Sequence, residues 1–265
     1  MSSPPQHSIV ANVQLTVHGR RLDLSMRVPT GPSRSGDLLP LFQAIADTMV
    51  NVAVAEATEA GRTISCRKGC GACCRQYVPL TPTEAHAIAR LVEQLPEPRR
   101  TQVRHRFDDA RARLQSAGML ERLRDEHLRG LSGDAIRRLG LDYFALGIAC
   151  PFLEDESCSI HAQRPIACRD YLVTSPAEHC ANPTPQTVRM VGGPIGKAWR
   201  ALAELDAAST GRPAARLPLV LALEFASAHP EAPPSSSGAA LLRDFFAAMT
   251  GAPQDIPPAP GLGQL

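Results

Sequence analysis

Cys66-Arg67-Lys68-Gly69-Cys70-Gly71-Ala72-Cys73-Cys74 is the stretch that decides how the rest of the chain is interpreted. It places four of the chain's eight cysteines within nine residues. A buried structural cysteine behaves as a small hydrophobe and gains nothing from recurring at short, glycine-containing intervals. Metal chelation does require such spacing, because several thiolates must converge on one point from a backbone that turns sharply. The stretch therefore predicts a metal-binding loop.

The other four cysteines lie in one later segment and can complete the site. A tetrahedral zinc ion or an iron–sulfur cluster needs about four ligands, so eight thiols are enough for two sites. Adjacent cysteines are expected to point apart, so that Cys73 and Cys74 serve different metals, or one ligates while the other packs. We predict metal ligands at Cys66, Cys70, Cys73, Cys74, Cys150, Cys158, Cys168 and Cys180.

Cations flank these cysteines in the sequence. A positive charge beside a thiol lowers its pKa and offsets the charge of a thiolate-rich centre. His161 is a further neighbour, for which an ordinary surface or packing role is favoured over metal ligation. The flanking cations are Arg67, Lys68, Arg75, Arg164 and Arg169.

The composition limits the classes of function. The chain has 265 residues, 44% of them hydrophobic, with a net charge of +2 and 4% aromatics. These values argue against nucleic-acid partners, which require a basic surface or a stacking platform. No secretory signal is visible, and the apolar runs are too short to cross a membrane. We expect a cytoplasmic protein, where clustered thiols stay reduced and bind metal or act in redox chemistry.

The hydrophobic pattern predicts a mainly α protein with a small N-terminal β-hairpin over residues 9–28. A long helix is expected from its N-cap at Asp37 to about Glu59. The sequence Thr81-Pro82-Thr83-Glu84 is a capping box that starts a second helix. The acidic run Glu154 to Glu156 predicts a tight turn between two short extended pieces. A further helix is expected with Val103, Phe107, Ala110 and Leu114 as its apolar stripe, and others near 196–208, 217–228 and 238–249.

This pattern suggests four parts of the chain. Residues 1–36 form the hairpin and a linker, and residues 37–180 the cysteine-cluster metal-binding domain with a helical insert. Residues 181–250 form a C-terminal helical extension. The proline- and glycine-rich composition of residues 251–265 predicts a disordered tail.

The helical insert is rich in arginine. Residues 99–138 contain 11 arginines and 6 acidic residues. These charges alternate in sign on amphipathic helices, so a solvated face is favoured over a basic docking surface for an acidic partner.

The spacing of Cys66, Cys70 and Cys73 coincides with the signature of radical S-adenosylmethionine enzymes. Those enzymes resemble one another in an aromatic residue before the last cysteine and in alternating strands and helices afterwards. Here Ala72 takes that place, and the following region has a helical pattern. A short motif outside its structural context is weak evidence.

The full pattern resembles a bacterial family of cysteine-cluster proteins, the YkgJ or CxxCxxCC family, described as zinc- or iron-chelating. The resemblance covers roughly residues 66–172, and the insert between its two halves is long here. Family members commonly carry tyrosine where this chain has His161. The matching positions are Cys66, Gly69, Cys70, Cys73, Cys74, Cys150, Pro151, Phe152, Leu153, Cys158, Ile160, Arg164, Pro165, Cys168 and Arg169.

The resemblance implies metal binding without an agreed activity. We expect a binding module that holds an iron–sulfur cluster or zinc, with iron–sulfur preferred because the spare thiols suit a cluster. The alternative is an iron–sulfur-dependent enzyme similar to the S-adenosylmethionine-using flagellin lysine N-methylases. Whether the chain is an enzyme stays open, no protein partner is indicated, and catalytic residues are unknown. Polar residues beside the cysteines, for which ligand orientation is favoured over acid–base chemistry, are Tyr77, Asp170, Tyr171 and His179.

Overall fold

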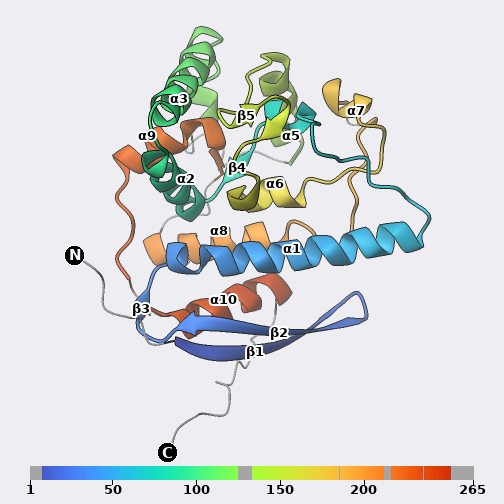
Figure 1. The fold of residues 1–265 in the computed structure, drawn as a ribbon, viewed down its shortest axis with the longest axis vertical. Coiled ribbons are helices and arrows are strands. Elements are labelled where there is room, and N and C mark those ends of the chain that lie inside the picture. The colour runs from blue at the N-terminus through green and yellow to red at the C-terminus, as the bar shows by residue number, and fades with distance from the viewer. Residues whose placement is uncertain (1–7, 125–132, 185, 212–215, 235, 252–265) are drawn as a thin grey trace, which may run out of the picture.

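The computed structural model describes residues 8–124, 133–184, 186–211, 216–234 and 236–251. Helices dominate, and a two-stranded antiparallel hairpin lies at the N-terminal end (Figure 1), which confirms the predicted fold class. The α-helices are α1 (Ser35–Glu59), α2 (Pro82–Gln94), α3 (Arg99–Ser116), α5 (Gly133–Ala145), α6 (Ile166–Asp170), α7 (Glu178–Ala181), α8 (Lys197–Thr210), α9 (Ala222–Ala228) and α10 (Gly238–Thr250).

The strands and 3-10 helices are short outside the hairpin. The strands are β1 (Ser8–Val17), β2 (Arg20–Pro29), β3 (Pro32–Ser33), β4 (Pro79–Leu80), β5 (Leu153–Glu154), β6 (Ser157–Cys158), β7 (Leu217–Pro218) and β8 (Ser236–Ser237). The 3-10 helices are η1 (Ala72–Arg75), η2 (Glu121–Leu123), η3 (His161–Gln163) and η4 (Leu219–Leu221). Every sheet in the described residues has two antiparallel strands, so these residues lack the parallel sheet expected of a radical enzyme.

The hairpin follows from its alternating pattern. Val13 of β1 pairs with Leu24 of β2, and the turn between the strands places His18 and Gly19 at φ values of 49° and 80°. Positive φ at both positions is what a two-residue hairpin turn of type I′ requires. The apolar side chains of β1 therefore share one face, which is buried.

The long helix α1 begins two residues before the predicted cap. Arg34 is its N-cap, and Asp37 lies inside the first turn, where its Oδ2 accepts a 2.8 Å hydrogen bond from the Arg34 backbone N–H. The predicted N-cap at Asp37 is therefore wrong, although its carboxylate does satisfy a backbone group at the helix start. The helix ends before Gly61, whose φ of 69° suits glycine.

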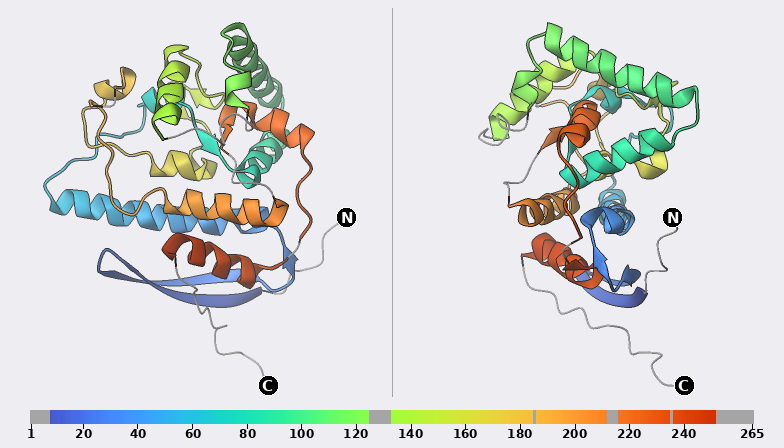
Figure 2. Two further views of the ribbon diagram at one scale, coloured as in Figure 1. Left: turned by 180° about the vertical axis from the view of Figure 1, so that it is seen from behind. Right: turned by 90° about the vertical axis from the view of Figure 1, so that its left-hand side faces the viewer.

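Helix α1 runs across the middle of the molecule, with the hairpin and α10 on one side and the cysteine segments on the other (Figures 1 and 2). By length and by its mean hydropathy of 1.5 it could cross a membrane, but half of that window is buried within the protein. A core helix meets the same two criteria. The cytoplasmic location stays a prediction.

One apolar core joins the two ends of the chain. The buried faces of β1 and β2 pack with α1, α8 and α10, and Phe42 stacks on Phe245 with ring centroids 4.2 Å apart. We call these five elements the hairpin layer. Residues placed by sequence in a separate N-terminal part and a separate C-terminal extension thus share one core.

The remaining helices form a second body above α1 (Figure 1). The predicted capping box starts α2: the Thr81 Oγ1 accepts from the Glu84 backbone N–H at 3.3 Å, and the Glu84 Oε2 accepts from the Thr81 N–H at 3.0 Å. The helix expected over 217–228 is shorter, because Leu217 pairs with Leu80 in a small sheet and α9 begins only at Ala222. Most of the predicted tail, residues 252–265, lies outside the described residues.

Candidate metal centre

All eight cysteines line a single cavity of about 650 Å³. They come from separate elements: the loop before η1, η1 itself, the loop before β5, then β6, α6 and α7. All eight are free thiols. The structure therefore brings together every cysteine that the sequence predicts as a ligand, including Cys180, the most deeply buried of them at 4% exposure.

The first cysteine segment turns sharply at its glycines. Gly69 has a φ of 81°, a conformation that side chains rarely adopt. Gly71 then approaches the β5–β6 turn so closely that a Cβ there would lie 2.5 Å from a Glu156 carboxylate oxygen. Both glycines are thus required by geometry.

The doubled cysteine lies in the 3-10 helix η1. Cys73 and Cys74 both line the cavity, and their thiols are hydrogen-bonded to each other. The expectation that they point apart is wrong, because both residues line the same cavity. The hydrogen bond from Cys74 lowers the pKa of Cys73 and raises that of Cys74, so this pair favours a single thiolate.

The two cysteine segments contact each other directly. The backbone N–H of Cys150 donates to the carbonyl of Cys74 at 2.7 Å. The predicted acidic turn is confirmed, with Asp155 and Glu156 at φ values of 47° and 54° between β5 and β6. Glu156 pairs with both terminal nitrogens of Arg75, at 3.0 and 2.6 Å. The turn is therefore fixed to η1, the helix that carries the doubled cysteine.

Cys168 is positioned by a buried carboxylate that the sequence indicated only as a helix cap. Glu84 is 1% exposed, and besides capping α2 its Oε1 accepts a 2.8 Å bond from the Ile166 N–H at the start of α6. Burial raises the pKa of Glu84 to about 7, despite its two backbone hydrogen bonds. Glu84 thus joins α2 to the short helix that carries Cys168.

Arg169 holds the loop that precedes α6. Its guanidinium donates to the carbonyls of Ala162 at 2.6 Å and Arg164 at 2.9 Å and pairs with Asp47 of α1 at 2.5 Å. These partners occupy the charge of Arg169, so its function is to fix backbone. Arg164, by contrast, lines the cavity itself.

Burial controls the protonation of most of the thiols. It raises the pKa of Cys150 to about 12 and that of Cys180 to about 11, and it raises the pKa of Cys168 well above its ordinary value. The pKa values of Cys66 and Cys158 are also raised, chiefly by burial, while Arg164 acts in the opposite direction. A buried set of thiols needs a positive centre to become thiolates, and a bound metal supplies one.

The donor set is sulfur-rich and spread out. Soft thiolates suit zinc and iron–sulfur clusters. Around a single tetrahedral zinc, sulfurs lie about 3.8 Å apart, given a Zn–S distance of about 2.3 Å. Among the described residues, no three His, Cys, Asp or Glu side chains are arranged to hold one ion. The donor set therefore has the chemistry to bind zinc or an iron–sulfur cluster.

The four polar residues predicted beside the centre divide into two pairs. Tyr77 and Tyr171 line the cavity; the Tyr77 hydroxyl donates to the Arg216 carbonyl at 2.7 Å, and the Tyr171 hydroxyl accepts from Gln76 at 2.8 Å. Asp170 and His179 do not line it. Asp170 binds the Gly196 N–H at 3.0 Å, and a ring nitrogen of His179 lies 3.0 Å from the Thr187 carbonyl.

Two arginine side chains of the insert also contact the second cysteine segment, which the sequence did not predict. Arg106 donates to the Pro151 carbonyl and to Glu154, both at 3.1 Å, and Arg99 lies 3.6 Å from Glu154. The signal was the acidic run opposite a basic helix, but the charge pattern alone does not say which charges meet. Part of the insert, residues 125–132, lies outside the described residues.

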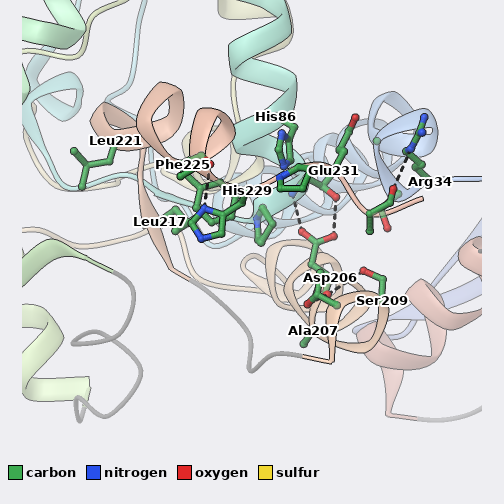
Figure 3. Close-up of a pocket in the computed structure, with 18 of the residues that line it drawn as sticks. Arg34, His86, Asp206, Ala207, Ser209, Leu217, Leu221, Phe225, His229 and Glu231 are labelled. Atoms are coloured by element: carbon green, nitrogen blue, oxygen red, sulfur yellow. Dashed lines mark hydrogen bonds between the residues drawn. The ribbon is translucent and has the colours of Figure 1, made fainter. Parts of the chain in front are cut away.

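A second cavity of about 900 Å³ lies between α2, α8 and α9, and no cysteine is among the residues that line it. In the view of Figure 3, His86, Phe225 and His229 lie on one side and Asp206 approaches from α8 on the other. Its carboxylates are engaged within the protein: Asp206 accepts from Thr83 at 2.6 and 2.8 Å, and Glu231 pairs with Arg90 at 2.6 Å. This cavity lacks the donor chemistry of the cysteine cavity.

Comparison with known families agrees with this geometry. Residues 65–184 match the family model "CxxCxxCC: Putative zinc- or iron-chelating domain". This segment is similar to CxxCxxCC domains. The match contains all eight cysteines, including Cys180, and extends beyond the resemblance seen in the sequence. No curated protein and no solved structure matches the chain. The family description supports binding of zinc or iron and goes no further.

Proposed function

We propose that this protein binds an iron–sulfur cluster in the cysteine cavity of its CxxCxxCC domain. The observation that carries the proposal is that eight free thiols line one cavity of about 650 Å³ without forming a compact three-ligand set in the described residues. A cluster of several irons and sulfides is larger than a single ion and takes its thiolates from a wider spacing. Eight thiols are also more than the four ligands that one tetrahedral zinc needs.

Apolar walls support the same proposal. Phe152, Ile160 and Leu219 line the cavity beside the cysteines, and Phe152 and Ile160 are at most 4% exposed. Apolar surroundings limit water access, which sets the stability and the reduction potential of a cluster. Metal binding requires free thiols, so we expect the protein to act in a reducing compartment, where thiols do not form disulfides.

The test is anaerobic purification of the full chain followed by iron, sulfide and zinc analysis and a visible spectrum. We expect a brown protein with iron and acid-labile sulfide in similar amounts. The matched control is the double variant Cys70→Ser/Cys158→Ser, which removes one thiol from each segment and should be colourless. A colourless wild-type protein with stoichiometric zinc would overturn the iron–sulfur proposal, and a folded protein free of metal would also overturn metal binding. The methyl-transfer alternative stays a prediction, separable by whether labelled S-adenosylmethionine binds.

A further inference from the structure

Arg164 has a position unlike the other cations near the cysteines. It lies between η3 and Pro165, and its backbone carbonyl accepts hydrogen bonds from the side chains of Arg169 at 2.9 Å and Gln43 at 3.3 Å. Its side chain lines the cysteine cavity and is only partly exposed. The backbone is therefore fixed so that the side chain reaches the cavity wall.

The guanidinium of Arg164 lacks an anionic partner in the described part of the chain. Its Nε is buried and has no hydrogen-bond partner there. Arg75 and Arg169 both have carboxylates, Glu156 and Asp47 respectively. Asp170 lies near enough to feel the charge of Arg164, but its Oδ1 is itself without a partner, so the two are not paired.

A partly buried guanidinium whose buried Nε has no partner is unfavourable, because removal of a charge from water is costly unless the charge is paired. The groups that Arg164 does face are thiols: its charge acts on Cys66, Cys73 and Cys158. Metal binding would turn these thiols into thiolates. A thiolate-bound centre in the cavity would supply the counter-charge that Arg164 lacks.

We propose that Arg164 stabilises the reduced state of the cluster held in the cysteine cavity and so raises its reduction potential. This inference rests on the proposed iron–sulfur function. On reduction one electron passes from an external one-electron donor to the cluster, whose net charge becomes one unit more negative, and no bond forms or breaks. A fixed positive charge at the cavity wall favours the more negative state. Net charge and hydrogen bonding near the sulfurs are known determinants of cluster potential.

The test is a potentiometric titration of the full-length holoprotein, with dithionite as reductant and the cluster signal read by electron paramagnetic resonance. Removal of the charge in Arg164→Gln should lower the reduction equilibrium constant about tenfold, a shift of about 59 mV to more negative potential. Arg164→Lys keeps the charge and should stay within about threefold of the wild type. Arg67→Gln is the matched control, because Arg67 lines the same cavity but is exposed and screened by water.

Each outcome is decisive. An unchanged potential in Arg164→Gln, or an equal shift in Arg67→Gln, would overturn the role of Arg164. Loss of the cluster from Arg164→Gln with retention in Arg164→Lys would support it, because of the two variants only Arg164→Lys keeps the positive charge. Loss from both, with iron and sulfide present in the wild type, would show that Arg164 only packs. Absence of iron and sulfide in the wild type would instead reject the proposed function.

Discussion

The hairpin layer and the cysteine cavity are built on different principles. The hairpin layer consists of long regular elements whose apolar faces meet, with Phe42, Phe245 and Phe246 fully buried. The cavity is built from turns, two-residue strands and helices of three to five residues, joined by hydrogen bonds and ion pairs such as Arg75–Glu156. Apolar burial stabilises a fold without any ligand, whereas short polar segments need one. We therefore expect stability and metal binding to depend mainly on separate parts of the molecule.

The largest expected effect is the loss of metal from Cys168→Ser. Cys168 lies on α6 and lines the cysteine cavity, so a serine there removes a soft ligand from a fixed position. Metal content per chain should fall at least about tenfold, while the helical circular dichroism of the hairpin layer stays. Cys180→Ser is the comparison and should lose less. Equal metal loss in both variants would contradict this ranking, and full retention by Cys168→Ser would contradict the site.

The second-largest effect is expected from a substitution in the hairpin layer. Phe245→Ala removes a fully buried ring that stacks on Phe42, and such truncations cost about 3–5 kcal/mol of unfolding free energy. Chemical denaturation measures the loss, and metal per folded chain should remain at the wild-type value. The control Val10→Ala, at an exposed position, should change stability by less than about 0.5 kcal/mol. Metal loss in parallel with stability would show that the two regions are not separate.

The third effect concerns Glu84, which joins α2 to α6. A glutamine offers one acceptor oxygen where Glu84 uses two, so Glu84→Gln should leave one buried backbone N–H unpaired and cost about 1–3 kcal/mol at pH near 5. The stability is measured by denaturation at several pH values. The control is Thr48→Ala, at a position of α1 where the hydroxyl bonds the Ala44 carbonyl of its own helix. Thr83, which also lies at the start of α2, is unsuitable as a control because its side chain binds Asp206.

The sign of its pH dependence follows from the raised pKa of Glu84. The ordinary value is 4.5 and the folded value about 7, so the folded state binds the proton more tightly than the unfolded state. Stability from this group is therefore present below about pH 4.5 and is lost as pH rises to about 7, by about 3 kcal/mol. The deficit of Glu84→Gln should shrink over that window. A deficit that grows with pH would contradict the assigned protonation.

The smallest effect is expected at the Arg75–Glu156 pair. Both side chains are at least one-third exposed, so water screens the pair and Arg75→Gln should cost under about 1 kcal/mol. Metal transfer to a chelator should accelerate by less than about fivefold. A double-mutant cycle with Glu156→Gln isolates the pair. A loss of metal as large as that of Cys168→Ser would mean that the turn, rather than the thiols, limits retention.

Much of the fold could be predicted from sequence where its elements are regular. Alternation places Val13 and Leu15 on one face, and the capping box fixes the start of α2 at Pro82. The shared core of the hairpin and the C-terminal helices could not be predicted, since hydrophobic periodicity says which face is buried but not against what.

The site could be predicted as a set of residues but not as an arrangement. Cysteine spacing identified every thiol that lines the cavity, whereas the doubled cysteine was misjudged because the 3-10 turn of η1 has no strong signal in local composition. The distinction between Arg164, which faces the cavity, and Arg169, which binds backbone and Asp47, depends on contacts between distant segments. No pattern along the chain separates them.

Hydrogen exchange of the full chain, with metal bound and after its removal by an anaerobic chelator, tests the central claim most directly. We predict that protection falls in residues 66–78 and 150–180 when the metal leaves, while α1, α8 and α10 keep theirs. Uniform loss of protection over the whole chain would contradict the account, because the hairpin layer would then depend on the metal. Unchanged protection in the cysteine segments would contradict it equally, because these segments would then hold their structure without the metal.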